Sequence, residues 1–197
     1  MTAQPSSGEF SAVIASGGVA VFGADTVYGL CCDADSAAAV GRLLALKRRL
    51  PGKPAAVAFF SLEPALAALP ELGERTRAAL CTLLPGPLTL LVPNPAGRFP
   101  LAGGELLGVR VFDVGLEADR PILLTSANLA GGPEARTLAE VPAQIVAGAD
   151  LALDRGELPG TPSTVVDLGA LEATGRWRIV RQGACTPEAL ERALVGS

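Results

Sequence analysis

Lys47, Arg48 and Arg49 form a run of three consecutive cations, and Lys53 follows them in a Pro/Gly-rich turn. Such a loop can fold around a polyanion, because arginine offers paired hydrogen bonds to phosphate oxygens and lysine adds a compact charge. The alternative is a solvated helix end, where the helix dipole also favours cations. The segment by itself leaves both interpretations open.

Hydroxyl and amide side chains stand at the ends of several apolar runs. Ser126 and Asn128 follow one run, Ser163 and Thr164 begin another, and Thr89 follows a rigid Pro-Gly-Pro turn. Open α/β sheets commonly bind ligands at strand ends, so these groups are candidates for holding phosphate or adenine. Ordinary turns would explain the same pattern.

Four further polar residues stand in unusual surroundings. Thr26 and Tyr28, the only tyrosine, lie next to Asp25 in the sequence. Arg110 interrupts an apolar run, and Arg181 ends the last one. An arginine in a buried strand needs an anionic partner, whereas one on an exposed sheet face needs none.

The composition excludes several kinds of chemistry. The 197 residues contain no histidine, which excludes Ser–His and Cys–His nucleophile pairs, histidine-ligated metals and proton transfer by imidazole. The formal net charge of -4 argues against a generally basic nucleic-acid-binding domain. No C-x-x-C pair occurs among the four cysteines, so we expect buried thiols in a reducing cytosol and no zinc site.

Targeting and nucleotide-binding signatures are also missing from the sequence. The first ten residues are polar, and the longest apolar runs are far shorter than the roughly 20 residues of a membrane span. We therefore expect a cytoplasmic protein with no membrane partner. Neither a Walker loop nor G-x-G-x-x-G occurs, so a bound nucleotide is not held in either of those ways.

Hydrophobic periodicity, capping residues and Pro/Gly breaks predict the elements that must position these side chains. We expect helices over residues 7–16, 36–49, 62–69, 72–84, 137–147 and 186–194. We expect strands over residues 19–22, 55–60, 89–92, 109–114, 122–125, 151–153, 164–168 and 177–181, and loops over 23–35, 93–106 and 126–136. Because two successive strands lack a helix between them, we expect an α/β or α+β fold with a mixed, twisted sheet, in a single domain over residues 1–197.

Seven short motifs follow one another in a specific order. They are Asp25-Thr26-Val27-Tyr28-Gly29-Leu30, Lys47-Arg48-Arg49 with Lys53-Pro54, Pro85-Gly86-Pro87-Leu88-Thr89, Val109-Arg110, Ser126-Ala127-Asn128-Leu129, Ser163-Thr164-Val165-Val166-Asp167 and Arg181-Gln182-Gly183. Each motif alone is weak, but the ordered set is far more specific. Together they resemble the YrdC-type threonylcarbamoyl-AMP synthase family, in its short form without a second C-terminal domain.

The resemblance implies an L-threonylcarbamoyladenylate synthase, a nucleotidyltransferase. Such enzymes take L-threonine, bicarbonate and ATP, release pyrophosphate, and supply the threonylcarbamoyl group that separate transferase proteins place on adenosine 37 of certain tRNAs. The implied fold is a YrdC-like twisted mixed sheet with helices around a concave, positively charged cleft. Mg²⁺ accompanies the ATP, and no protein-bound metal is implied.

Residue roles carried over from the family fall into two groups. Lys47 and Arg49 are implied to be catalytic. The ATP-binding set is Lys47, Arg49, Lys53, Thr89, Ser126, Asn128 and Arg181. The threonine-binding set is Thr26, Tyr28, Arg110, Ser163 and Thr164. Adenylation of a carbamate brings two anions together, so cations and hydrogen-bond donors matter more than a proton shuttle, and a histidine-free chain can perform it.

Several positions depart from the family pattern. They are Gly23, Ala24, Leu50, Ala58, Phe112, Ala130 and Glu134. Glu134 would place negative charge near a phosphate site, and Ala58 stands where some members have a histidine near threonine. These departures keep two alternatives open: a YrdC-like paralogue that uses another carbamoyl or acyl adenylate, and a non-catalytic double-stranded RNA-binding module. The module would bind RNA through the basic patch, in a salt-sensitive manner.

Overall fold

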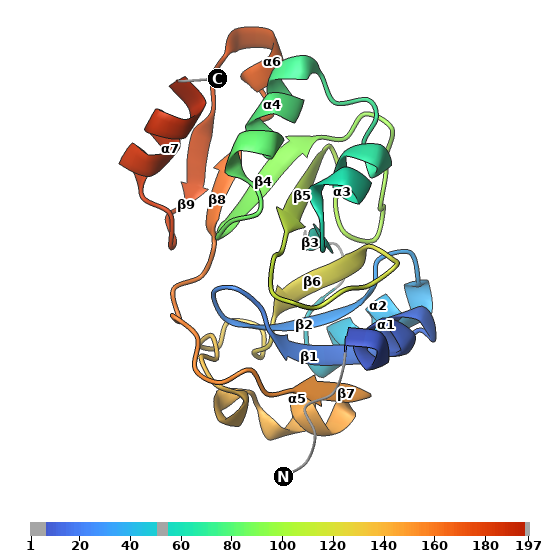
Figure 1. The fold of residues 1–197 in the computed structure, drawn as a ribbon. Helices are drawn as coiled ribbons and strands as arrows, with labels where there is room; N and C mark the ends of the chain where they lie inside the picture. The colour runs from blue at the N-terminus through green and yellow to red at the C-terminus, as the bar shows by residue number, and fades with distance from the viewer. Residues whose placement is uncertain (1–6, 51–54, 196–197) are drawn as a thin grey trace.

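The computed structural model describes residues 7–50 and 55–195. Within them the chain forms a nine-stranded sheet with the strand order β7-β1-β2-β6-β3-β5-β4-β8-β9 (Figure 1). The strands are β1 (Val19–Gly23), β2 (Tyr28–Asp33), β3 (Ala56–Phe59), β4 (Leu88–Pro93), β5 (Leu106–Val111), β6 (Ile122–Ser126), β7 (Leu151–Leu153), β8 (Thr164–Asp167) and β9 (Arg178–Arg181). The pairs β1–β7, β3–β5 and β4–β8 are parallel and the other neighbours are antiparallel, which confirms the expected mixed sheet.

Among the described residues, eight helical segments pack around this sheet. They are α1 (Ser7–Ala15), α2 (Ala37–Leu46), α3 (Leu62–Ala68), α4 (Glu74–Leu83), the 3-10 turn η1 (Leu138–Glu140), α5 (Ala143–Gly148), α6 (Leu171–Thr174) and α7 (Pro187–Val195). Two helix starts are capped by hydroxyls, because the amide of Ala39 donates to Ser36 Oγ and that of Ala189 donates to Thr186 Oγ1, each at 3.3 Å. The short helix α6 had no clear signal in the sequence.

Two of the elements expected from the sequence are wrong. The loop expected over residues 23–35 contains β2, which pairs with β1 and β6. Its six residues are all buried, because Tyr28, Leu30 and Cys32 enter the larger core and Cys31 enters the smaller one. The helix expected over residues 137–147 is broken between η1 and α5. Pro142 has no amide hydrogen and disfavours the helical conformation at the residue before it, and Val141 is accordingly extended, with ψ of 130°.

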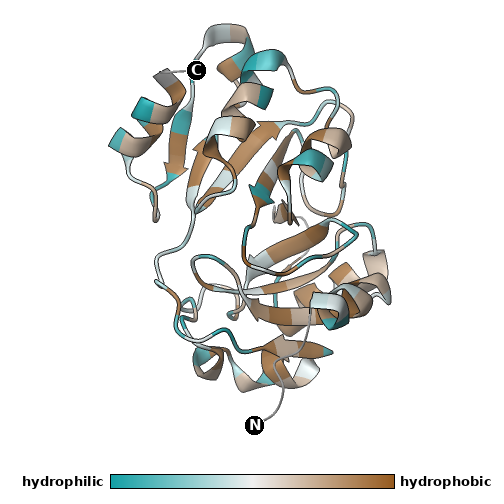
Figure 2. Cartoon of the chain, viewed as in Figure 1, coloured by the Kyte–Doolittle hydropathy of each residue, from teal (hydrophilic) through white to brown (hydrophobic). Residues whose placement is uncertain are grey.

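The two faces of the sheet are covered differently. Side chains alternate between faces along each strand, and on β5 Leu107, Val109 and Val111 enter the larger of two hydrophobic cores. The helices contributing buried residues to this core are α2, α3, α4, α5, α6 and α7. Figure 2 shows that the strands are mostly hydrophobic, whereas the helices carry hydrophilic stretches.

The opposite face is covered only in part. Phe10 and Ile14 of α1 form a smaller core with Phe22 and Phe112, and α1 packs against β1 and β2. Further along that face, the residues of β5 that alternate with the larger core are Leu106, Gly108 and Arg110. These three residues line a pocket.

Candidate active site

A pocket of about 670 Å³ lies on the face of the sheet opposite the larger core. Its floor is made of residues that pair across neighbouring strands. These register partners are Gly29 with Ser126, Leu124 with Ala56, Ala56 with Gly108, Gly108 with Leu91, Thr89 with Val165, and Val165 with Arg181. Small residues at the centre leave room above the sheet, and polar groups stand around them.

Seven of the site residues expected from the sequence line this pocket. They are Thr26, Arg49, Thr89, Arg110, Ser126, Ser163 and Arg181. Four others, Lys47, Tyr28, Asn128 and Thr164, lie next to it with their polar groups bonded elsewhere in the protein. Lys53 lies outside the described residues.

The side chain of Lys47 organises the loop that follows β6. Its buried Nζ donates to the carbonyl oxygen of Ser126, and at 2.8 Å to both the carbonyl oxygen and Oδ1 of Asn128. The Asn128 amide in turn donates to Gly132 O at 2.6 Å. Burial, reinforced by the Arg49 cation, lowers the pKa of Lys47 to about 8. All three ammonium protons are thus engaged in holding the loop that presents the Ser126 hydroxyl.

A turn after α2 separates Lys47 from Arg49. The amide of Arg49 donates to Leu44 O and that of Arg48 donates to Ala45 O, which is the Schellman pattern of helix termination. Arg48 adopts φ of 52°, a left-handed conformation that costs a non-glycine residue about 1 kcal/mol. The helix therefore stops at Leu46, earlier than expected, and Arg49 enters the pocket, where Nη1 donates to Thr125 Oγ1 at 3.2 Å.

Arg110 is the buried cation of the pocket. Its Nη2 lies 2.5 Å from Asp25 Oδ1, and its guanidinium carbon lies 4.8 Å from the centre of the Phe112 ring. Burial lowers the pKa of Arg110, and the Asp25 carboxylate opposes that effect. The sequence left a solvent-facing Arg110 open; the structure gives it the anionic partner instead.

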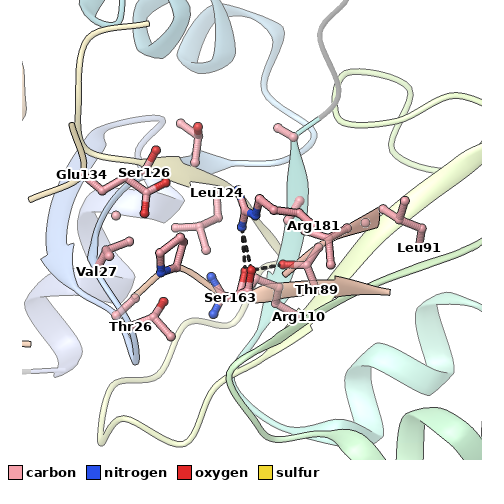
Figure 3. Close-up of a pocket in the computed structure, with 18 of the residues that line it drawn as sticks. Thr26, Val27, Thr89, Leu91, Arg110, Leu124, Ser126, Glu134, Ser163 and Arg181 are labelled. Atoms are coloured by element: carbon pink, nitrogen blue, oxygen red, sulfur yellow. Dashed lines mark hydrogen bonds between the residues drawn. The ribbon is translucent and has the colours of Figure 1, made fainter. Parts of the chain in front are cut away.

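A hydroxyl chain stands on the wall formed by β4, β8 and β9. Thr89 Oγ1 and Ser163 Oγ are 2.9 Å apart, and Arg181 Nη2 donates to Ser163 O at 2.8 Å and to Ser163 Oγ at 3.2 Å (Figure 3). Thr164 points the other way, donating to Cys185 O and accepting from the amides of Gly183 and Cys185. Thr164 thereby fixes the turn after Arg181.

Tyr28 anchors the segment between β7 and β8. Its buried hydroxyl lies 3.0 Å from Asp154 Oδ1 and 2.9 Å from Gly156 O, and it accepts a hydrogen bond from the Arg155 amide at 2.9 Å. Burial raises the pKa of Tyr28. The same segment is tied to the pocket wall by the Gly160 amide, which donates to Thr26 O at 2.9 Å, and it leads into Ser163.

The departures from the family pattern fall in different places. Ala24 and Glu134 line the pocket, whereas Ala58 and Phe112 are buried in the smaller core. Leu50 is 75% exposed. A Cβ added at Gly23 would lie 2.8 Å from Arg155 Cβ, so glycine fits there and any other residue would force Arg155 to shift. Ala130 is exposed.

Sequence reasoning missed the floor of the pocket and its second acidic residue, Glu105. Gly108 and Leu106 follow from Arg110 by the two-residue period of a strand, but only once the pairing of the strands is known. Three arginines, Arg49, Arg110 and Arg181, and two glutamates, Glu105 and Glu134, line the pocket. A positively charged cleft stays a prediction.

The described residues contain no group of three or more potential metal ligands, and no helix among them is long and apolar enough to cross a membrane. Mg²⁺ commonly keeps several waters and binds through one or two protein ligands plus the phosphates of a nucleotide. The hydroxyl oxygens that line the pocket, such as that of Ser126, suit such an ion.

Comparison with known proteins agrees with this arrangement. Residues 12–183 match the Sua5/YciO/YrdC family model, described as "Telomere recombination". The chain is 38% identical over 178 residues to a threonylcarbamoyl-AMP synthase of Chromohalobacter salexigens, covering 84% of this chain and 94% of that protein. It is 35% identical over 166 residues to the threonylcarbamoyl-AMP synthase of Escherichia coli O6:H1, covering 76% and 84%.

Among solved structures, the crystal structure of P. abyssi Sua5 complexed with L-threonine matches with a TM-score of 0.80 and 27% identity. The match covers 95% of this chain and 56% of that one, so this chain spans a little over half of that protein. The resemblance inferred from the seven motifs is confirmed: the chain belongs to the Sua5/YciO/YrdC family.

Proposed function

We propose that the protein is a threonylcarbamoyl-AMP synthase, which forms threonylcarbamoyl-AMP and pyrophosphate from L-threonine, bicarbonate and ATP. The observation that carries this proposal is that seven residues from separate motifs, including Thr26, Arg49 and Arg181, meet in one pocket. The names of the two curated relatives and the threonine complex of P. abyssi Sua5 support it.

The pocket suits a reaction between two anions. A carbamate that attacks the α-phosphate of ATP needs charge neutralisation and alignment, and it needs no proton removed at that step. Arg49 enters the pocket beside Thr125 of β6, and Arg181 enters it from β9 at the edge of the sheet. Arg110 supplies a third cation for the carboxylate or carbamate. Mg²⁺ bound with ATP would supply further neutralisation, with the Ser126 hydroxyl as its protein contact.

The expected ligand sets are kept in this proposal with two refinements. Arg49, Thr89, Ser126 and Arg181 would contact ATP, and Lys47 with Asn128 would act by shaping the loop that carries Ser126. Lys53 keeps its expected ATP-binding role. Thr26, Arg110 and Ser163 would contact threonine, whereas Tyr28 and Thr164 would position the backbone around them.

The wider setting belongs to the proposal as well. It comprises one domain over residues 1–197, a cytoplasmic location, and delivery of the adenylate to separate transferase proteins that modify tRNA. The continuity of the sheet through both walls of the pocket supports a single domain. The net charge of -4 does not favour direct binding of RNA.

The test is pyrophosphate release from ATP by the purified protein, measured with and without L-threonine and bicarbonate. We expect release to require both. Arg49→Gln should raise the KM for ATP by about tenfold or more, since an arginine–phosphate contact contributes about 1.5–3 kcal/mol. Arg48→Gln is the matched control, because Arg48 is exposed and donates to Gln144 Oε1; its KM should stay within about twofold of the wild-type value.

Three results would contradict the proposal. A folded protein that binds ATP but shows no threonine-dependent release is not this synthase. A larger stimulation by another amino acid or by carbamoyl phosphate would favour the paralogue alternative. RNA binding without any ATP turnover would favour the non-catalytic module.

A further inference from the structure

Arg110 and Glu134 are opposite charges that line the same pocket without pairing with each other. Arg110 forms its ion pair with Asp25, and Glu134 takes part in none of the ion pairs among the described residues. Burial lowers the pKa values of Arg110 and Lys47, and Glu134 is close enough for its negative charge to oppose that effect. The carboxylate of Glu134 thus sits within the field of two cations and bonds to neither.

Each of the two residues also has a buried polar atom without a hydrogen-bond partner among the described residues. These atoms are Arg110 Nε and Glu134 Oε2. Lys47 cannot donate a hydrogen bond to Glu134, because its three ammonium protons are already donated to Ser126 and Asn128. A buried carboxylate oxygen without a donor is costly. Because Glu134 lines the pocket, a donor can be supplied by a ligand bound there.

The placement of the two charges defines the chemistry of that ligand. Figure 3 shows Glu134 and Ser126 on one side of the pocket, and Ser163 and Arg181 on the other. The Glu134 carboxylate disfavours an anionic group directly beside it, and the arginines disfavour a cationic group directly beside them. A zwitterion, with an ammonium group beside a carboxylate, satisfies both.

We propose that Glu134 binds the α-ammonium group of the amino-acid substrate, while Arg110 faces its carboxylate. This inference rests on the proposed function and adds to it the group that recognises the amine. Glu134 departs from the family pattern, and the sequence places its negative charge near an expected phosphate site. Here it is the acceptor that selects an amino acid over a hydroxy acid in the same pocket.

The test is calorimetric binding of two ligands to the full chain without ATP. The ligands are L-threonine and 2,3-dihydroxybutanoate of the same configuration, in which a hydroxyl replaces the ammonium group. Glu134→Gln keeps the shape of the side chain but removes its charge. It should weaken L-threonine binding by about tenfold or more and leave the affinity for the hydroxy acid within about twofold.

Glu105→Gln is the matched control, because Glu105 is the other glutamate at the pocket and its side chain is exposed. Its affinity for both ligands should stay within about twofold of the wild-type value. Thermal unfolding of both variants checks that the fold is kept.

Three outcomes would overturn the inference. Unchanged threonine affinity in Glu134→Gln shows that the carboxylate does not meet the ammonium group. Equal losses for both ligands show a structural role. Loss of Mn²⁺ binding in the presence of ATP, with threonine affinity intact, assigns Glu134 to the metal. Failure of the proposed function is distinct, since the wild-type protein would then show no threonine-dependent pyrophosphate release.

Discussion

Replacing Tyr28 with phenylalanine is expected to lower the free energy of unfolding by about 2 kcal/mol. The side chain is fully buried, and its hydroxyl donates towards Asp154 Oδ1 and accepts from the Arg155 amide. A bond to an exposed carboxylate and a bond to an amide each contribute about 1 kcal/mol net. In a chain of this size, the loss corresponds to a melting temperature lower by about 4–8 °C.

Urea unfolding near neutral pH measures this change, with the midpoint shifted and the slope unchanged. A double-mutant cycle with Asp154→Ala separates the part carried by that pair, and its coupling energy should be about 1 kcal/mol. Tyr28 is the only tyrosine, so an absorbance titration of tyrosinate reports this residue alone.

The pH dependence provides a second readout for Tyr28. Burial raises its pKa in the folded protein above the ordinary value of 10.0. Above pH 10.0 the unfolded chain therefore loses the phenolic proton first, and the stability that Tyr28 contributes is lost as the pH rises. The difference in stability between the wild type and Tyr28→Phe should shrink in that range. Equal midpoints near neutral pH, or a phenol that titrates near 10.0 while the protein is folded, would refute the reasoning.

Two further predictions concern the cysteines and the pocket floor. The expectation that all four thiols are buried is wrong for Cys81, which is exposed. A thiol reagent should label Cys81 and should reach Cys31 and Cys32 only after unfolding, because burial raises the pKa of Cys31 well above its ordinary value and that of Cys32 to about 12. Mass spectrometry of the labelled peptides checks this, and rapid labelling of Cys31 in the folded protein would contradict it. Gly108→Val should greatly reduce threonine-dependent pyrophosphate release, because the rest of the valine side chain enters the pocket. The protein should stay folded, because a Cβ at this position meets its nearest neighbour, Thr89 Cγ2, at 3.4 Å, which is an ordinary contact. Gly41→Ala is its control: nothing lies within 4 Å of that Cβ, so release should be unchanged and stability should rise by about 1 kcal/mol.

Local signals in the sequence were sufficient for much of the fold and for part of the site. Eight of the nine strands coincide with apolar runs between Pro/Gly breaks, and the cap at Thr186 follows from its hydroxyl. Arg49, Ser126 and Arg181 were expected at the site because charged or hydroxyl side chains next to predicted elements are visible without knowing what those elements touch. The seven ordered motifs also indicated the protein family.

Tertiary structure decided which of the expected side chains face the pocket. Lys47 and Arg49 are two residues apart, and Arg48 between them adopts a left-handed conformation. The Lys47 ammonium group therefore bonds to the loop after β6, whereas the Arg49 guanidinium lines the pocket. Tyr28 belongs to a motif of the site, but its hydroxyl bonds to Asp154, 126 residues away. Sequence periodicity assigns a residue to a face, and it does not say which distant group completes its hydrogen bonds.

The pocket floor and the Arg110–Glu134 arrangement also depend on long-range pairing. Gly108 becomes part of a floor only because β5 lies between β3 and β4, which sets Ala56 and Leu91 on either side of it. The role proposed for Glu134 depends on Arg110, a cation on a strand that precedes it by more than 20 residues. The sequence by itself determined the composition of the site and the periods of its strands. The order and register of those strands, which only the folded chain sets, determined what each side chain faces.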